Sequence, residues 1–253
     1  MKLDDKFPVS TIAIVMMIVL AVCLAAPARA SFGPPLTAAT VPADTSWASG
    51  FNLPGTDSMV ITALVSGDSL FLGGGFRTVG ADSFAGVAMY DGVRWSGLGQ
   101  GITGPVFCLT LWNGWLVAGG GFKTTDGAPG NYLAYWDGIA WHPWPVEVNG
   151  QVTSFEMYNG ELIVGGEFTQ GGSTTLNCAG AWDGAQWVPL GSGFAYPATP
   201  RVYDLLVWRE QLYACGRFQQ AGGVDALCLA AWDGAAWSAV PTGPDGWAYQ
   251  IAG

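Results

Sequence analysis

The sequence predicts an all-β fold, a β-propeller of four-stranded antiparallel blades, because two different motifs repeat along it with one shared period. The first motif is an apolar or small residue, two mostly glycine positions, any residue and a phenylalanine; it ends at Phe76, Phe122, Phe168 and Phe218, which lie 46, 46 and 50 residues apart. The second is an aromatic residue, Asp and Gly, followed by a tryptophan. Its members are Asp91, Asp137, Asp183 and Asp233, with Trp95, Trp141, Trp187 and Trp237. A period of about 40–50 residues is typical of propeller blades.

Each repeat contains patterns for four short strands. In the second repeat, an apolar run at 106–111 precedes Asn113-Gly114, a dipeptide that favours a tight hairpin turn. A glycine-containing strand follows at 115–122. The third strand, 132–136, ends at an Asp-Gly turn, where the aspartate accepts hydrogen bonds from local backbone amides. The fourth strand starts near Trp141. A sheet of this size cannot bury both faces alone, so we expect the repeats to stack around an axis.

The tryptophan of the fourth strand recurs in every repeat, which indicates a structural role. A ring at the same place in each blade would fill the wedge between neighbouring blades and bury about 150–250 Å². We therefore assign these four tryptophans to the core and the four aspartates to hairpin turns.

Four complete blades are expected at about 58–98, 104–144, 150–190 and 200–240, within a propeller spanning 44–253. Residues 44–52 contain Trp47 and resemble a fourth strand without a blade of its own, and 246–252 leave room for one further strand. We expect these two segments to contribute to a partial closing blade, since closure removes an open sheet edge. Two interpretations remain open: a chain that lacks C-terminal repeats, or a four-bladed ring with frayed ends.

Residues 1–30 have the pattern of a signal peptide. Lys2 and Lys6 precede an apolar stretch at 12–26, and Ala28-Arg29-Ala30 supplies the small residues that a signal peptidase requires. The apolar stretch is shorter than the roughly 20 residues of a membrane span, although a transmembrane anchor is the alternative. We expect residues 31–43 to form a linker, no membrane span after cleavage, and a secreted or cell-surface location.

Charge and composition exclude several classes of function. The formal net charge is −10, and the six basic residues after position 30 form no run, so a nucleic-acid partner is not expected. His142 is the single histidine, and neither a catalytic set nor a metal-ligand cluster can be assembled. We expect no cofactor, no metal and no enzymatic activity.

Candidate ligand contacts lie in the long connections, which vary between repeats and should share one face of the propeller. Trp144, Phe194 and Tyr196 are aromatic and break the repeat pattern, and we select them as binding candidates. Cys215 and Cys228 flank a long loop on strands that should pair, within reach of a disulfide. A bridge and two free thiols are both compatible with this spacing.

The motif GGxF…WDGxxW resembles the kelch-like propellers, the superfamily of the galactose oxidase central domain. It is similar in particular to secreted bacterial proteins built from tandem kelch-like blades, in which such blades often precede a C-terminal surface-sorting module. The resemblance covers about residues 44–253 and implies a fold without implying a ligand. WD40 propellers fit less well because they expect a Gly-His pair in each blade, and sialidases because Gly follows Asp directly here.

These observations predict an exported, non-enzymatic β-propeller that acts as a binding or surface module for a protein or carbohydrate ligand. Two alternatives belong to other classes. A secreted carbohydrate-active enzyme would gather carboxylates near the central channel, and a purely structural surface protein would have no defined pocket.

Overall fold

The computed structural model describes residues 55–125, 128–129, 131–241 and 246–252. Within these ranges the protein is all-β and contains no helix, and therefore none that could cross a membrane. The predicted signal peptide (1–30), the linker (31–43) and the segment 44–52 lie outside the described residues.

Four antiparallel four-stranded sheets form the body of the protein, one in each predicted repeat. The first contains β1 (Val60–Ser66), β2 (Ser69–Gly74), β5 (Val87–Tyr90) and β6 (Trp95–Gly97). The second contains β8 (Val106–Trp112), β9 (Trp115–Gly120), β12 (Leu133–Trp136) and β13 (Trp141–Pro143). The third contains β14 (Gln151–Tyr158), β15 (Glu161–Glu167), β18 (Ala179–Trp182) and β19 (Trp187–Pro189). The fourth contains β21 (Arg201–Trp208), β22 (Gln211–Arg217), β25 (Leu229–Trp232) and β26 (Trp237–Ala239).

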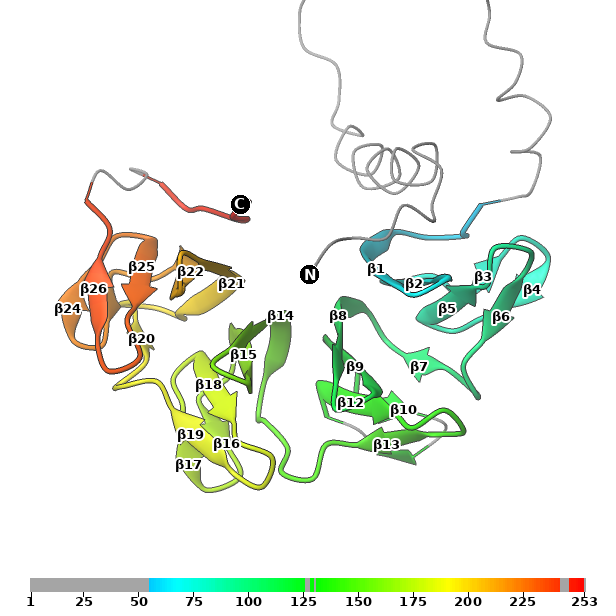
Figure 1. Cartoon of the computed structure of the whole chain (residues 1–253), viewed down its shortest axis with the longest axis horizontal. Coiled ribbons are helices and arrows are strands. Elements are labelled where there is room, and N and C mark those ends of the chain that lie inside the picture. Colours follow the sequence, from blue (N-terminus) through cyan, green and yellow to red (C-terminus); the bar gives the residue numbers. More distant parts are fainter. Residues whose placement is uncertain (1–54, 126–127, 130, 242–245, 253) are drawn as a thin grey trace, which may run out of the picture.

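The four sheets are arranged in an arc, with the first strand of each sheet on the inside (Figure 1). β1, β8, β14 and β21 lie next to one another in that order, and the second strand of each sheet contacts the first strand of the next. The first and fourth sheets lie at the two ends of the arc, so the described residues do not form a closed ring (Figure 1).

Small hairpins extend each sheet at one end. They are β3 (Thr78–Val79) with β4 (Asp82–Ser83), β10 (Thr124–Thr125) with β11 (Ala128–Pro129), β16 (Gln170–Gly171) with β17 (Thr174–Thr175), and β23 (Gln220–Ala221) with β24 (Val224–Asp225). The segment entering each sheet pairs with that hairpin, through Thr56, β7 (Ile102–Thr103), Val148 and β20 (Phe194–Ala195). The two kinds of long connection therefore lie together at one end of the sheets, which we call the loop face.

The two glycines of the repeated motif have different contacts. A Cβ added to the first glycine would collide with the next sheet; at Gly165 it would lie 2.8 Å from Val202. A Cβ added to the second would lie 2.1 Å from a carbonyl oxygen of the first strand, as at Gly74 and Gly166. The first glycine thus permits stacking between sheets, and the second permits close approach within a sheet.

Three of the four repeated tryptophans are buried between sheets. Trp141, Trp187 and Trp237 are 3–4% exposed, and each donates its Nε1 hydrogen to a carbonyl of the connection that leaves the preceding sheet. Trp95 lies in the first sheet, on the flank at the end of the arc, and is partly exposed. The position of the sheet in the arc therefore decides how fully its tryptophan is buried.

The four repeated aspartates lie in the turns between the third and fourth strands. In each, one carboxylate oxygen accepts backbone hydrogen bonds of 2.7–2.8 Å from the residues two and three positions later. These hydrogen bonds lower the pKa of Asp91, Asp183 and Asp233 below 3.8. The pKa of Asp137 falls to about 2 because its backbone hydrogen bonds are joined by one to His142.

We expect acid to destabilise the fold through these turns. A carboxylate with a lowered pKa binds fewer protons in the folded than in the unfolded chain, so its stabilisation is fully present well above the unfolded pKa of 3.8 and is lost as pH falls through the lower folded pKa. Thermal unfolding at pH 5 and pH 3 should therefore show a smaller acid-induced drop in Tm for Asp183→Asn than for the wild type. Equal drops would contradict this role of the turn.

The four cysteines that follow the predicted leader are free and buried in the described structure. The disulfide considered between Cys215 and Cys228 is not formed, because the strand register pairs Cys215 with Leu229. The Cys228 thiol instead donates to the Phe218 carbonyl. Burial raises the pKa of the Cys215 thiol to about 12, which disfavours the reactive thiolate.

The segment 246–252 lies along the fourth sheet without forming a named strand. The Ile251 amide donates to Asp204 Oδ2 at 2.9 Å. One sheet earlier, the Leu205 amide donates in the same way to Ser154 Oγ at 3.1 Å. This segment therefore contacts β21 as β21 contacts β14.

Candidate functional site

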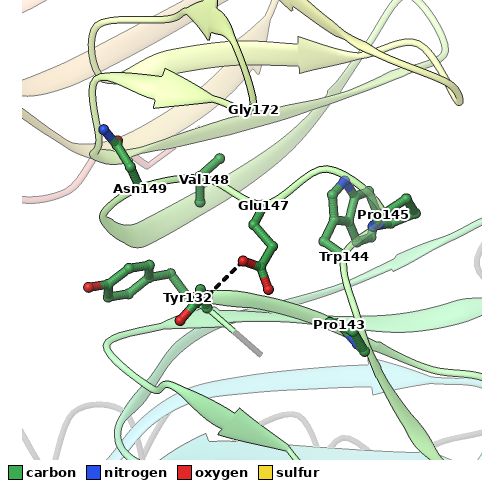
Figure 2. Close-up of a pocket in the computed structure, with 9 residues that line it drawn as sticks. Tyr132, Pro143, Trp144, Pro145, Glu147, Val148, Asn149 and Gly172 are labelled. Atoms are coloured by element: carbon green, nitrogen blue, oxygen red, sulfur yellow. Dashed lines mark hydrogen bonds between the residues drawn. The ribbon is translucent and has the colours of Figure 1, made fainter. Parts of the chain in front are cut away.

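A pocket of about 740 Å³ opens on the loop face between the second and third sheets (Figure 2). Asn131 and Tyr132 line it from the segment before β12, and Gly172 lines it from the β16–β17 turn. Pro143 lines it from the end of β13, and the remaining lining residues belong to the connection between β13 and β14: Trp144, Pro145, Glu147, Val148 and Asn149.

The pocket arises where this connection departs from the other two. The connections after the first and third sheets contain Gly-x-Gly, at 99–101 and 191–193, with positive φ angles at all four glycines. At the second of these glycines, an added Cβ would lie 2.3–2.5 Å from backbone carbonyls of the neighbouring loop, so those connections pack tightly against it. The corresponding residues here are Pro145, Val146 and Glu147. Because proline fixes φ near −65°, this connection takes another path and leaves space.

Glu147 supplies the carboxylate of the pocket. Its Oε2 accepts a hydrogen bond of 2.6 Å from Asn131 Nδ2, which orients the side chain (Figure 2). Asn149 is held differently, because its amide oxygen accepts backbone hydrogen bonds from Thr169 and Gln170. Among the described residues, the Tyr132 hydroxyl has no hydrogen-bond partner. The pocket is thus lined by a fixed acceptor, Glu147, and by a tyrosine, Tyr132, whose ring points away from the Glu147 carboxylate (Figure 2).

Trp144 forms an apolar wall of this pocket, but the side chain is only 2% exposed. It occupies the position of Leu98 and Leu190, three residues after the fourth-strand tryptophan, and packs against Trp112 and Trp182 at ring distances of 5.6 Å. Its Nε1 is buried without a hydrogen-bond partner in the described structure. The predicted contact residue is therefore mainly a core residue whose edge reaches the pocket.

The other two aromatic candidates lie away from this pocket. Phe194 is 3% exposed and packs against Phe218 and Trp237, in the place that Ile102 and Val148 occupy in the other connections. As a buried side chain it cannot contact a ligand on the surface, which corrects its selection. Tyr196 is partly exposed and lies 5.9 Å from the guanidinium carbon of Arg217. Of the three aromatic candidates, Tyr196 has the most accessible side chain.

The described residues contain no group of three or more His, Cys, Asp or Glu side chains that could hold a metal ion. His142 pairs with Asp137 at 2.8 Å and stacks on Tyr135, outside the lining of the pocket. The predictions that the chain is not an enzyme and needs no cofactor stay predictions.

Comparison with known proteins gives little information on function. No family model matches the chain, and no curated protein matches it. A solved structure with a similar arrangement is the extracellular domain of the putative hybrid two-component system BT4673 from B. thetaiotaomicron, with a TM-score of 0.49 and 12% sequence identity. The match covers 74% of this chain and 22% of that one. The resemblance to kelch-like blades therefore stays a prediction from the motifs.

Proposed function

We propose that this chain is an exported, non-enzymatic β-propeller that binds a glycan through its loop face. Four sheets of four strands, stacked in an arc with their first strands inside, support the propeller assignment. Export rests on the leader-like pattern of residues 1–30.

The pocket between the second and third sheets is the observation on which the binding function rests. Concave sites that combine apolar walls with a few fixed polar groups are typical ligand sites. Glu147 and Asn131 offer an oriented acceptor and donor pair, Tyr132 offers a hydroxyl group, and proline side chains line the wall. Such groups suit the hydroxyls of a sugar. A neutral sugar is favoured because Glu147 is the charged residue of the pocket and would repel an anion.

Binding is favoured over hydrolysis by the number of carboxylates. Most glycosidases use two, on either side of the scissile bond. Glu147 is the single carboxylate among the residues that line the described pocket. A second carboxylate at catalytic distance would be needed for the enzymatic alternative.

We expect the protein without residues 1–30 to retain a neutral oligosaccharide on a glycan array. Glu147→Gln should weaken that binding about tenfold, since it removes the charged acceptor of hydroxyl hydrogen bonds. Affinity can be measured by titration calorimetry with the best ligand of the array. Glu210→Gln is the matched control, because Glu210 is exposed in the β21–β22 turn at the opposite end of the sheets. Retention of no glycan, or equal affinities of Glu147→Gln and the wild type, would refute the proposal.

A further inference from the structure

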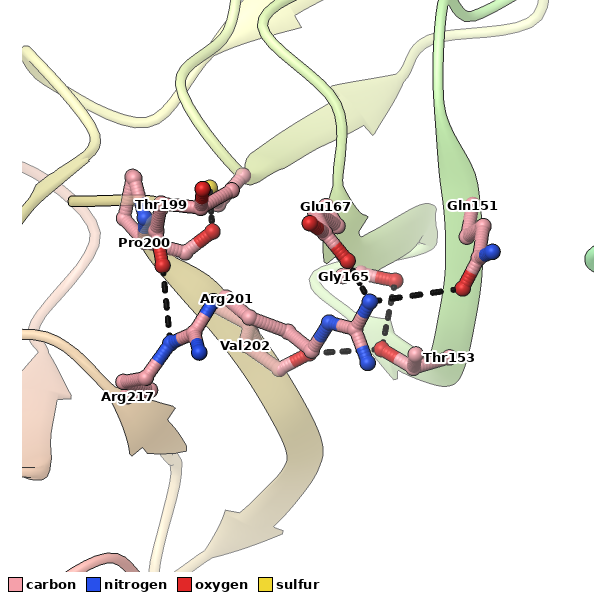
Figure 3. A network of polar contacts seen from close by, with 10 residues as sticks. Gln151, Thr153, Gly165, Glu167, Thr199, Pro200, Arg201, Val202 and Arg217 are labelled. Carbon is pink, nitrogen blue, oxygen red and sulfur yellow. Dashed lines mark hydrogen bonds and ion pairs between the residues drawn. The ribbon is translucent and has the colours of Figure 1, made fainter.

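A second cluster of aromatic and cationic side chains lies on the fourth sheet, apart from the pocket. At the end of β22, the guanidinium carbon of Arg217 is 5.9 Å from the ring centre of Tyr196 and 5.6 Å from that of Trp247. Its Nε donates to the Thr199 carbonyl at 2.8 Å, which holds the head group in place (Figure 3). In the described part of the chain no carboxylate pairs with Arg217, and within those residues its Nε is the guanidinium atom that forms a hydrogen bond.

Arg201, the neighbour of Arg217, differs from it in its ion pairing. Arg201 and Arg217 are directly opposite each other on β21 and β22, an arrangement in which like charges repel. Arg201 forms an ion pair with Glu167 and a hydrogen bond of 3.3 Å to Gln151 (Figure 3). Its charge is thereby compensated, whereas no carboxylate of the described residues pairs with Arg217. The pair leaves a local positive charge in a chain whose formal net charge is −10.

The two arginines are not required by the repeat. The equivalent cross-strand positions carry Met59 with Gly75, Pro105 with Gly121, and Gln151 with Glu167. Three sheets therefore stack without a cation here. A half-buried arginine that pairs with no described carboxylate, at a position where the other three repeats have no cation, is a candidate for ligand recognition.

Exposed aromatic rings adjoin this cation. Trp247 is 48% exposed, and Tyr249 is 64% exposed and stacks on Tyr203 with ring centres 4.9 Å apart. Exposed rings of this size provide flat apolar surfaces on which the C–H face of a sugar can lie, and Arg217 lies over the ring of Trp247. Arginine in turn binds carboxylates through paired, charge-assisted hydrogen bonds.

We propose that Arg217, Tyr196 and Trp247 form a second binding site, specific for a sugar that carries a carboxylate. The carboxylate contacts the outer N–H groups of Arg217, and the sugar ring lies against Trp247. This site has the opposite charge to the pocket at Glu147 and shares no residue with it, so the inference stands independently of the function proposed for that pocket.

The test compares glucuronate with glucose, which differ in the carboxylate. Ligand-observed NMR titrations with the full chain should show glucuronate binding at least about tenfold more tightly than glucose. Arg217→Gln and Trp247→Ala should each reduce glucuronate binding about tenfold, with an unchanged Tm to show that the fold is intact. Arg94→Gln is the matched control, since Arg94 is exposed in the β5–β6 turn of the first sheet. Glu147→Gln should leave glucuronate binding unchanged.

Three results would overturn the inference. One is equal binding of glucuronate and glucose, and another is full glucuronate binding by Arg217→Gln. The third is binding of a triglutamate peptide that depends on Arg217 while glucuronate does not bind, which would assign the arginine to an acidic peptide instead.

Discussion

Gly74→Ala is expected to lower the free energy of unfolding by about 3 kcal/mol, because the added methyl group meets backbone rather than mobile side chains. The new Cβ would lie 2.1 Å from the Met59 carbonyl oxygen and 3.0 Å from Val60 Cα. Neither atom can rotate away, so β1 and β2 must separate. Urea denaturation monitored by tryptophan fluorescence measures the effect.

The adjacent glycine provides the control. A Cβ added to Gly75 would have its nearest neighbour, Ser58 Oγ, at 3.6 Å, which is ordinary contact. Gly75→Ala should therefore stay within about 0.5 kcal/mol of the wild type. Equal losses in the two variants would show that glycine is needed there for another reason than close strand approach.

The second large effect is expected for Trp187→Ala, which should lower the free energy of unfolding by about 3–5 kcal/mol. Trp187 fills the space between the second and third sheets, lies against Gly171, and donates to the Val146 carbonyl at 2.7 Å. Its removal leaves a cavity and an unpaired carbonyl. The loss can be measured by urea denaturation with a fluorescence readout from the remaining tryptophans.

The same substitution at the end of the arc serves as comparison. Trp95→Ala removes a chemically identical ring that is partly exposed on the flank of the first sheet. Its cost should be clearly smaller, since less apolar surface returns to water. Equal costs at the two positions would mean that burial between described sheets does not account for the role of the tryptophan.

The period and the turn chemistry were sufficient to predict four sheets. The Asn-Gly and Asp-Gly dipeptides specify local hairpins, and Asn113 and Asn159 adopt the positive φ angles that such turns require. The hairpins of the loop face were not predicted, because each of their strands contains two residues and has no readable alternation.

The described pocket lies among the long connections from which the binding candidates were selected, and Trp144 is the one candidate that lines it. Trp144 and Phe194 were selected because they interrupt the repeat. Counted from the fourth-strand tryptophan, however, each occupies a position at which the other repeats also have an apolar core residue. Aligning Trp144 with Leu98 and Leu190 would have revealed this. Glu147 was missed, although it stands where the other two connections have glycine. Arg217 could not be found from sequence, because only the strand register places it beside Arg201.

The exchange of Gly-x-Gly for Pro145-Val146-Glu147 alters a connection without altering the sheets that it joins. It changes one connection and leaves the strand register of the flanking sheets the same as in the other repeats. The tight connections at 99–101 and 191–193 thus fill the space that the connection after the second sheet leaves open as a pocket. The connections of the loop face can therefore differ between repeats while the strands of the sheets keep their pairing.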